Sequence, residues 1–307
     1  MTGRGGAGKV ITLVSRDNGV GLSTDMALLE EVLVPAGHRV RRVHWRAHRM
    51  PRCDVVIFLE LFTPKLLDYA RTSVGVFNME WFLHRWRRFL PQITQLWAKS
   101  EEAMRLYEGW DLHNAMYTGF ASRDLYDPAV PRTRTCLHLK GHSDLKGTET
   151  VLEAWRRHRD LPPLTIISAK PLPAPAGVTV LPRLPHDELV RQVNTAAIHL
   201  CPSRSEGWGH YITEGLSTGA IVVTTDASPM NEHVRPDWGY LVPVAGSRPR
   251  GLAREHEVDP DELAAAVRQA AALPSRTRRR MAALARSHVA ARNAEFRRVA
   301  LTLIEGL

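Results

Sequence analysis

Short apolar runs alternate with helical or polar segments along most of the chain. In its first part such runs lie at Val10–Val14, Val55–Leu59, Val74–Phe77 and Leu96–Ala98, with a further candidate strand at Val40–Trp45, and each is followed by a helical or loop segment. Apolar runs this short, bounded by turns, are typical of strands buried on both faces. The pattern therefore predicts an α/β fold with a parallel sheet covered by helices on both faces.

The alternation breaks once and then restarts. Pro128 and Pro131 interrupt it within residues 118–134, and it resumes at Leu137. Amphipathic segments at residues 149–158, 186–196 and 210–218 then alternate with apolar runs at 164–168, 198–203 and 220–225. We expect two doubly wound domains, at residues 1–130 and 131–307. The second ends in a helix whose residues 276–298 hold eight arginines and one acid, Glu295.

Composition narrows the class of protein. The chain has 307 residues, of which 44% are apolar, so it can bury a core and is not generally disordered. No apolar run is long enough to span a membrane, and the first residues do not form a secretory signal. The cysteines, Cys53, Cys136 and Cys201, are scattered without metal-ligand spacing. We expect a cytoplasmic protein with no disulfide, no metal site and no bound cofactor.

Two glycine-containing segments near the N-terminus are candidates for binding phosphate. Gly3–Val10 fits G-x-x-x-x-G-K, but it ends in valine where a P-loop needs a hydroxyl, and it precedes a strand instead of following one. An ATPase of the P-loop type is therefore disfavoured. Arg16–Asp25 lies between a strand and a helix, and its Gly19 and Gly21 would expose amides to a phosphate. The same glycines could instead serve only the geometry of the turn.

A third candidate follows the apolar run 198–203. Glu206, Gly207 and Gly209 lie in a short loop, and Glu214 lies about one turn into the next helix. Open α/β sheets bind ligands at this carboxyl edge, where two offset carboxylates could each accept hydrogen bonds from vicinal hydroxyls of a sugar. On the two acids alone, a simple helix start with a solvated glutamate explains the pattern better.

The wider context favours a binding site. Residues 201–234 resemble the donor site of the family-4, or group 1, glycosyltransferases of the GT-B fold, which is written roughly P-S-x-x-E-G-[FW]-G-x-x-x-x-E-x-x-x-x-G-x-x-V-V. The matching positions are Pro202, Ser203, Glu206, Gly207, Gly209, Glu214, Gly219, Val222 and Val223, followed by an acid at Glu232. Residues 18–40, 141–155 and 258–269 resemble further segments of the same family, in the expected order.

The resemblance implies two Rossmann-like domains facing a central cleft and a retaining, metal-independent transfer from a nucleotide sugar, carried by UDP or GDP. Lys146 would neutralise the leaving diphosphate, Glu206 would contact the transferred sugar, and Glu214 would hold the donor ribose. The family's phosphate-binding arginine is His142 here, and Lys140 or Arg183 could compensate. The implied donor-binding set is Gly19, Gly21, Lys140, His142, Arg183, Gly207, Trp208, Gly209 and Glu214.

The acceptor side is less defined. The family binds its acceptor in the N-terminal domain, where Asn78, Glu80 and His84 stand in place of its usual histidine. Residues 38–52 carry six arginines and three histidines without an acid, and the net charge is +9. An anionic acceptor, including hydroxylated DNA, would suit this field, although such runs usually face water. A nucleic-acid-binding protein with a vestigial sugar site is the alternative.

Overall fold

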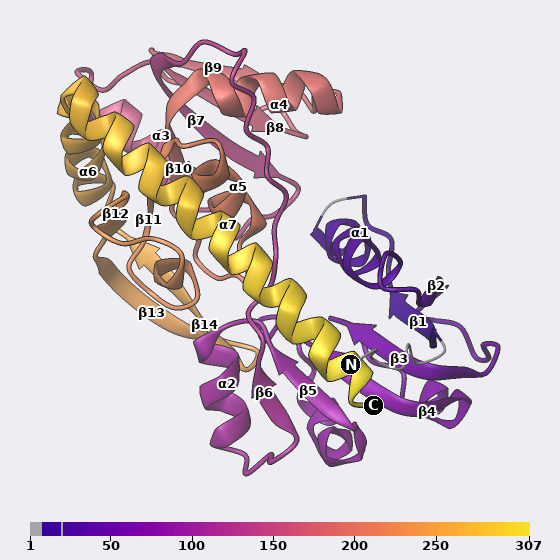
Figure 1. Ribbon diagram of the computed structural model, residues 1–307. Coiled ribbons are helices and arrows are strands. Elements are labelled where there is room, and N and C mark those ends of the chain that lie inside the picture. The colour runs from indigo at the N-terminus through magenta and orange to yellow at the C-terminus, as the bar shows by residue number, and fades with distance from the viewer. Residues whose placement is uncertain (1–7, 20) are drawn as a thin grey trace. The chain divides into compact units, whose positions relative to one another are not determined.

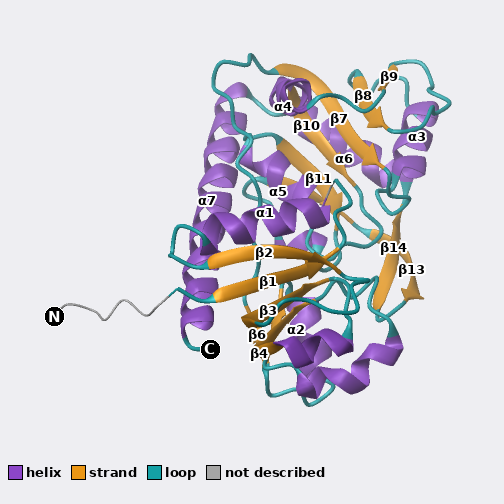
Figure 2. Ribbon diagram, turned by 90° about the vertical axis from the view of Figure 1, so that its right-hand side faces the viewer, coloured by secondary structure: helices purple, strands orange, loops and turns teal. Residues whose placement is uncertain are grey.

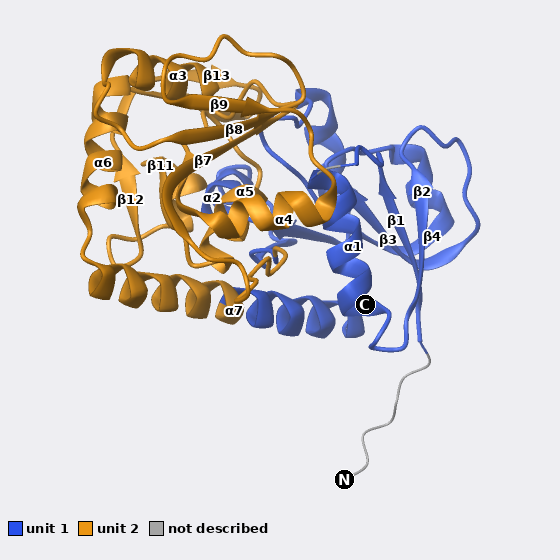
Figure 3. Cartoon of the chain, turned by 90° about the horizontal axis from the view of Figure 1, so that it is seen from above, with its two compact units in different colours: residues 1–121, 292–307 blue, residues 122–291 orange. Residues whose placement is uncertain are grey.

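The computed structural model describes residues 8–19 and 21–307, which form two compact units (Figure 3). Unit 1 comprises residues 1–121 and 292–307, and unit 2 comprises residues 122–291. The division thus differs from the expected domains, because the first unit ends before Pro128 and the chain's last residues return to it. Within unit 1, the ring of Phe296 packs 4.5 Å from that of Phe120, and Lys9 Nζ donates to the carbonyl of Ile304 at 2.7 Å.

Unit 1 contains a six-stranded parallel sheet in the order β2-β1-β3-β4-β5-β6 (Figure 1). The strands are β1 Val10–Ser15, β2 Arg39–His44, β3 Cys53–Leu59, β4 Ala70–Val76, β5 Gln95–Ala98 and β6 Ala115–Tyr117. The central strand β3 is almost entirely buried, in keeping with its continuous apolar run. The first five strands were predicted from the sequence and are confirmed.

Helices α1 Gly21–Leu33 and α2 Glu101–Glu108 pack against this sheet. Ser100 caps α2 by accepting a hydrogen bond from the amide of Ala103 at 3.1 Å. Two segments form 3₁₀ helices, η1 Pro64–Tyr69 and η2 His84–Gln92. Pro91 lies inside η2, and proline disrupts a regular α-helix by removing a backbone donor.

Unit 2 contains a second six-stranded parallel sheet, in the order β12-β11-β10-β7-β8-β9 (Figure 2). Its strands are β7 Thr133–Gly141, β8 Leu164–Ser168, β9 Val178–Leu181, β10 Ala196–Cys201, β11 Ile221–Thr225 and β12 Gly239–Val242. A separate antiparallel pair, β13 Val244–Arg250 and β14 Ala253–Val258, follows β12. The expected α/β class with two doubly wound sheets is confirmed.

Helices cover both faces of the second sheet. Cys136, Ile198 and Val223 belong to a core shared with α3 Thr148–Arg157 and α6 Pro260–Ala272. On the other face lie α4 His186–Thr195, α5 His210–Ser217 and part of α7 Ser275–Glu305, which contributes Ala285 and Val289. A 3₁₀ turn, η3 Met230–Glu232, precedes β12. Successive side chains of each strand point to opposite faces of the sheet, so each face has its own core. Burial on both faces is expected for parallel strands.

Four further details complete the description. Asp259 caps the start of α6 by accepting a hydrogen bond from the amide of Asp261, as is ordinary for an acid before a helix. The three cysteines are free and buried. Across residues 8–19 and 21–307, no helix has the length and apolar character needed to cross a membrane. The G-x-x-x-x-G-K segment lies mostly outside the described residues.

Candidate active site

The carboxyl ends of β7 and β10 bring two distant loops together in unit 2. The chain leaves β7 toward β8 and β9 on one side and returns at β10 on the other, so the gap between β7 and β10 is the switch point where doubly wound sheets bind ligands. Gly147 in the first loop has φ of 69°, and a Cβ there would lie 2.0 Å from the carbonyl oxygen of Pro202 in the second. Only glycine allows this close approach.

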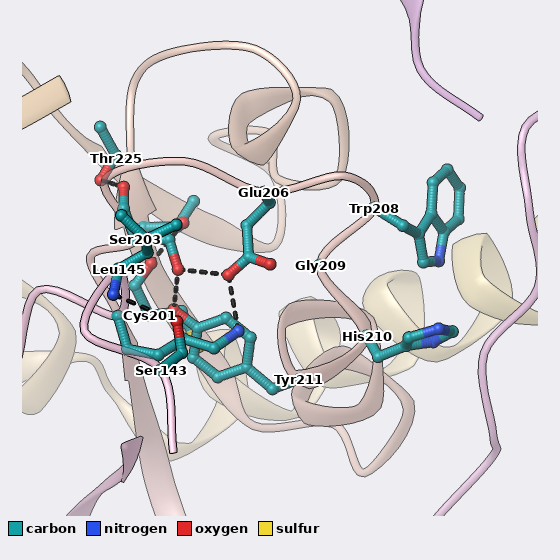
Figure 4. A network of polar contacts seen from close by, with 12 residues as sticks. Ser143, Leu145, Cys201, Ser203, Glu206, Trp208, Gly209, His210, Tyr211 and Thr225 are labelled. Carbon is teal, nitrogen blue, oxygen red and sulfur yellow. Dashed lines mark hydrogen bonds and ion pairs between the residues drawn. The ribbon is translucent and has the colours of Figure 1, made fainter. Parts of the chain in front are cut away.

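The approach joins the two residues expected to carry the chemistry. Lys146 Nζ lies 2.6 Å from Glu206 Oε1, and their side chains are 19% and 13% exposed. Ser203 donates its hydroxyl hydrogen to the same carboxylate oxygen at 2.5 Å, and the ammonium lies 3.7 Å from the centre of the Tyr211 ring. Figure 4 shows Glu206 directed toward Ser203 and Tyr211. The two loops therefore bring Lys146 and Glu206 into direct contact.

The hydrogen bonds around Glu206 have a defined direction. A carboxylate can only accept, so Ser203 donates to Glu206 and must accept from the hydroxyl of Tyr211. Burial raises the pKa of Tyr211 well above its ordinary value, so the phenol keeps its proton. Glu206 thus accepts hydrogen bonds from two donors, Ser203 and Lys146, of which the second is charged.

A buried histidine that the sequence analysis missed supports the Lys146 loop. His138 in β7 lies 2.8 Å through Nδ1 from the carbonyl of Leu200 and 2.8 Å through Nε2 from the hydroxyl of Thr148. Because a carbonyl only accepts, Nδ1 carries the proton and Nε2 accepts from Thr148. Burial lowers the pKa of His138 to about 4, so the ring is neutral near pH 7. The sequence gives little indication of this role, because His138 is one of several polar residues in β7 and is marked only by its two leucine neighbours.

The loop after Glu206 is anchored by its tryptophan. Trp208 is 3% exposed, and its indole donates to the hydroxyl of Ser122 at 3.0 Å and packs edge-on against His233. The indole therefore anchors the loop and is buried. A side chain that contacts a ligand would be open to solvent before the ligand binds. Gly209, with φ of 94°, directly precedes α5, and Gly207 is partly exposed.

Glu214 differs from Glu206 in its surroundings. It lies in the second turn of α5 and is partly exposed. Its carboxylate makes no hydrogen bond or ion pair with the residues that the structure describes, although its carbonyl accepts from Ser217 at 2.8 Å. An unengaged carboxylate beside this sheet edge can accept two hydrogen bonds from a vicinal diol.

The other predicted donor residues surround the β7–α3 loop. Lys140 is buried and lies 3.1 Å from Asp144 through Nζ. It lines a cavity of about 190 Å³ together with Gly147, Thr148, Arg204 and Glu257. His142 and Arg183 are exposed and make no polar contact within the described part of the chain. Each could therefore meet a phosphate.

In the glycine loop of unit 1, the amide of Gly19 already has hydrogen-bond partners within the protein. Gly19 has φ of 66°, and its amide donates to Ser23 Oγ at 2.7 Å and to Asp17 Oδ1 at 3.3 Å. Hydrogen bonds from Ser23 and Gly19 lower the pKa of Asp17. A carboxylate thus lies beside the start of α1, where the sequence predicted that a phosphate would bind. Gly21 begins the helix, and a Cβ there would meet nothing within 4 Å.

Of the predicted acceptor residues, Asn78 and Glu80 are partly or fully buried, and His84 is exposed. Asn78 Nδ2 donates to Glu60 Oε2 at 2.9 Å, and Glu80 is 8% exposed. His84 is the exposed first residue of the 3₁₀ helix η2. Glu60 is a second residue that the sequence analysis missed, because it belongs to none of the recognised segments.

The basic stretch of residues 38–52 covers an edge strand of unit 1. Arg41 donates to the hydroxyl of Thr12 and to two backbone carbonyls, and Arg42 forms an ion pair with Glu30 at 2.6 Å. Arg46 lies over the ring of Trp45. Much of the stretch is therefore engaged within its own unit. Among the described residues, no group of three or more His, Cys, Asp or Glu is arranged to hold a metal.

Residues 168–288 match the family model described as "Glycosyl transferases group 1". This segment includes Glu206 and Glu214, and the resemblance expected from the sequence is confirmed. Among curated proteins, no sequence matches the chain.

Solved structures share the fold at low sequence identity. A glycosyltransferase from Rickettsia africae ESF-5 is 13% identical with a TM-score of 0.74, over 96% of this chain and 97% of that one. Sucrose-phosphate synthase from Thermosynechococcus elongatus is 14% identical with a TM-score of 0.75, over 97% and 100%. HepE from Anabaena, solved with UDP and glucose, is 14% identical with a TM-score of 0.70, over 97% and 100%. The chain therefore has the GT-B type of fold.

Proposed function

We propose that this protein is a glycosyltransferase that moves a sugar from a UDP- or GDP-activated donor to a hydroxyl group, without a metal and with retention of configuration at the anomeric carbon. The observation that carries the proposal is the contact of Lys146 with Glu206 at the switch point of unit 2, followed in α5 by the unengaged carboxylate of Glu214. The family model over residues 168–288 supports the enzyme class, and the complex of HepE with UDP supports the donor class.

The reaction assigns a role to each group. The bond between the sugar's anomeric carbon and the diphosphate breaks with its electron pair on the diphosphate, while the acceptor oxygen bonds to that carbon. The hydroxyl proton leaves with the diphosphate, so charge balances. Lys146 stabilises the negative charge that develops on the leaving group. Glu206 accepts hydrogen bonds from the transferred sugar, and Glu214 accepts them from the ribose.

The ion pair gives this assignment a physical basis. Before the donor binds, Glu206 holds Lys146 in place at 2.6 Å, so the ammonium is positioned in advance. When the diphosphate arrives, the ammonium gains a second anionic partner, and its charge supplies stabilisation that a divalent metal provides in other transferases. Lys140, His142 and Arg183 are the further groups that would contact the phosphates or the nucleoside.

Two measurements test the proposal. In a thermal-shift screen, one of UDP, GDP, UDP-glucose, UDP-N-acetylglucosamine and GDP-mannose should raise the melting temperature, because a ligand that binds only the folded state stabilises it. The same nucleotide sugar should then release its nucleoside diphosphate, with full activity in the presence of a chelator. A protein that binds DNA yet neither shifts with nor turns over any nucleotide sugar has a vestigial site, and the proposal is then wrong.

A further inference from the structure

The sheet of unit 1 has a switch point of its own. The chain leaves β1 for β2 on one side and returns to β3 on the other, so the carboxyl ends of β1 and β3 lie side by side. Ser15 at the end of β1 donates its hydroxyl hydrogen to the carbonyl of Leu59 at the end of β3, at 3.2 Å. Doubly wound sheets bind ligands outside the strands at such a point.

Glu60 is the first residue after β3, at this point. It is only 9% exposed, and its backbone has φ of 61°, in the left-handed region that side chains other than Gly, Asn and Asp rarely adopt. The amide of Glu60 donates to the carbonyl of Val76 at 3.0 Å, which fixes this conformation. A buried carboxyl group and a left-handed backbone both cost free energy, and such combinations are concentrated at functional sites.

Asn78 contacts Glu60 and determines which side-chain atoms beside it are left to bind a ligand. The side-chain nitrogen of Asn78 donates to Glu60 Oε2 at 2.9 Å, which leaves Asn78 Oδ1 directed elsewhere. That oxygen is buried and has no hydrogen-bond partner among residues 8–19 and 21–307. A buried acceptor without a donor is costly, and a bound hydroxyl group would satisfy it.

The charges around Glu60 nearly cancel. Lys99 and Asp25 form a buried ion pair at 2.6 Å, and Arg16 contributes a second cation nearby. Burial raises the pKa of Glu60, whereas the hydrogen bond from Asn78 and the charges of Lys99 and Arg16 oppose that rise. A carboxyl group in this position disfavours a phosphate and favours neutral hydrogen-bond donors.

We infer that Glu60 and Asn78 bind the acceptor of the transfer reaction, and that this acceptor presents neighbouring hydroxyl groups, as a neutral sugar or polyol does. The inference rests on the proposed function. Glu60 and Asn78 each offer an oxygen that accepts a hydrogen bond, so two adjacent hydroxyls can bind at once. Because the proton of the reacting hydroxyl leaves with the diphosphate, Glu60 positions the acceptor and does not have to remove that proton.

Two substitutions test the assignment. Glu60→Gln keeps the size of the side chain and its hydrogen bond from Asn78 but removes the charge, and Asn78→Ala removes the unsatisfied oxygen. The acceptors are methyl glycosides of glucose, galactose and mannose together with myo-inositol, each offered with the nucleotide sugar that the enzyme hydrolyses. Products are identified by mass spectrometry. Glu31→Gln, an exposed glutamate of α1, is the matched control.

We expect the wild type to glycosylate at least one of these neutral acceptors. Both variants should raise the acceptor KM at least tenfold, while the donor-induced rise in melting temperature and donor hydrolysis without acceptor stay at the wild-type level. Glu60→Asn adds a test of folding, because asparagine tolerates a left-handed backbone. Its melting temperature should equal or exceed that of the wild type although acceptor use is lost.

Four results separate the outcomes. Unchanged acceptor kinetics in both variants overturn the inference, as does an equal loss in the Glu31→Gln control. A wild type that hydrolyses the donor but glycosylates none of the neutral acceptors also overturns it and leaves the proposed function standing. If the wild type neither binds nor turns over any nucleotide sugar, the proposed function itself fails.

Discussion

The ammonium of Lys146 contacts the carboxylate of Glu206 at 2.6 Å, although 60 positions separate the two residues in the chain. The strand order of unit 2 explains this contact, because β7 and β10 are neighbours in the sheet and both loops leave its carboxyl edge. The pair is also partly shielded from water, which strengthens the attraction relative to an exposed ion pair. Substitutions at the two positions should therefore not act independently.

Lys146→Ala should reduce turnover about 100-fold or more, because one cation directed at the leaving group typically contributes a few kcal/mol to the transition state. The measurement is steady-state release of the nucleoside diphosphate, with the exposed Lys170→Ala as the control. The double variant Lys146→Ala with Glu206→Gln should lose less than the product of the two single losses. Near-normal activity of Lys146→Ala, or an absolute need for added divalent metal, would contradict the assigned role.

Glu214→Gln and Glu206→Gln should have different kinetic effects. Glu214 is unengaged within the described chain, so its change should leave the melting temperature unaltered and mainly raise the donor KM. Glu206 holds Lys146 and Ser203, so its change should lower kcat more than it raises KM. Donor titrations of both variants decide the matter, and two equal, mild effects would show that the assignment is wrong.

Gly147→Ala should damage the site more than Gly141→Ala does. Both glycines have positive φ, which costs an alanine on the order of 1 kcal/mol. At Gly147 the new Cβ would also lie 2.0 Å from the carbonyl of Pro202, whereas at Gly141 it would meet nothing within 4 Å. We expect Gly147→Ala to cost at least about 3 kcal/mol in total and to abolish turnover. Urea denaturation and activity of the two variants, compared side by side, test this, and equal losses would refute it.

Stability should fall on mild acidification because of His138. The unfolded ring has a pKa near 6.5, and in the folded protein burial lowers the pKa to about 4, so between these values the unfolded state binds more protons. Stability is therefore complete above about pH 6.5 and decreases as pH falls toward 4. The expected loss from His138 alone is about 2 kcal/mol at pH 5 relative to pH 7.5.

Urea denaturation at the two pH values measures this loss. His199, whose pKa burial lowers to about 3, contributes in the same direction, so the variant His138→Asn should retain only part of the pH dependence. Asparagine can still donate to the carbonyl of Leu200, which limits its own cost. If the wild type and the variant lose equal stability between pH 7.5 and pH 5, His138 is not the source.

Most of the strands that were predicted have short continuous apolar runs, such as residues 55–59 and 220–225, whereas the short strands β6, β9 and β12 were missed. The pair β13–β14 was missed because its sequence, with Arg248, Glu255 and His256, is mostly polar. In the structure Glu255 is buried within the hairpin by arginines, including Arg204 at 2.6 Å. Such stabilisation depends on long-range ion pairs, which local hydrophobic patterns do not reveal.

The residues of the candidate site also fall into those that the sequence revealed and those that it did not. Glu206, Glu214 and Lys146 were found because each lies in a segment with a recognisable spacing. His138 and Glu60 were missed because their importance comes from what the sheet places beside them, namely Thr148 for one and Asn78 for the other. Trp208 was found as part of the motif, but its spacing could not show that its indole is buried and bonded to Ser122.

The last helix, α7, belongs to two cores, since Ala285 packs in unit 2 and Phe296 packs in unit 1. On the ribosome, residues 1–121 emerge long before residues 292–307, with the whole of unit 2 made in between. At about 5–20 residues per second, this delay lasts on the order of ten seconds or more. During that time Phe120 lacks its partner ring, so the first unit to be synthesised is the last to be completed. A nascent chain arrested before residue 292 should therefore protect unit 2 from protease before it protects unit 1.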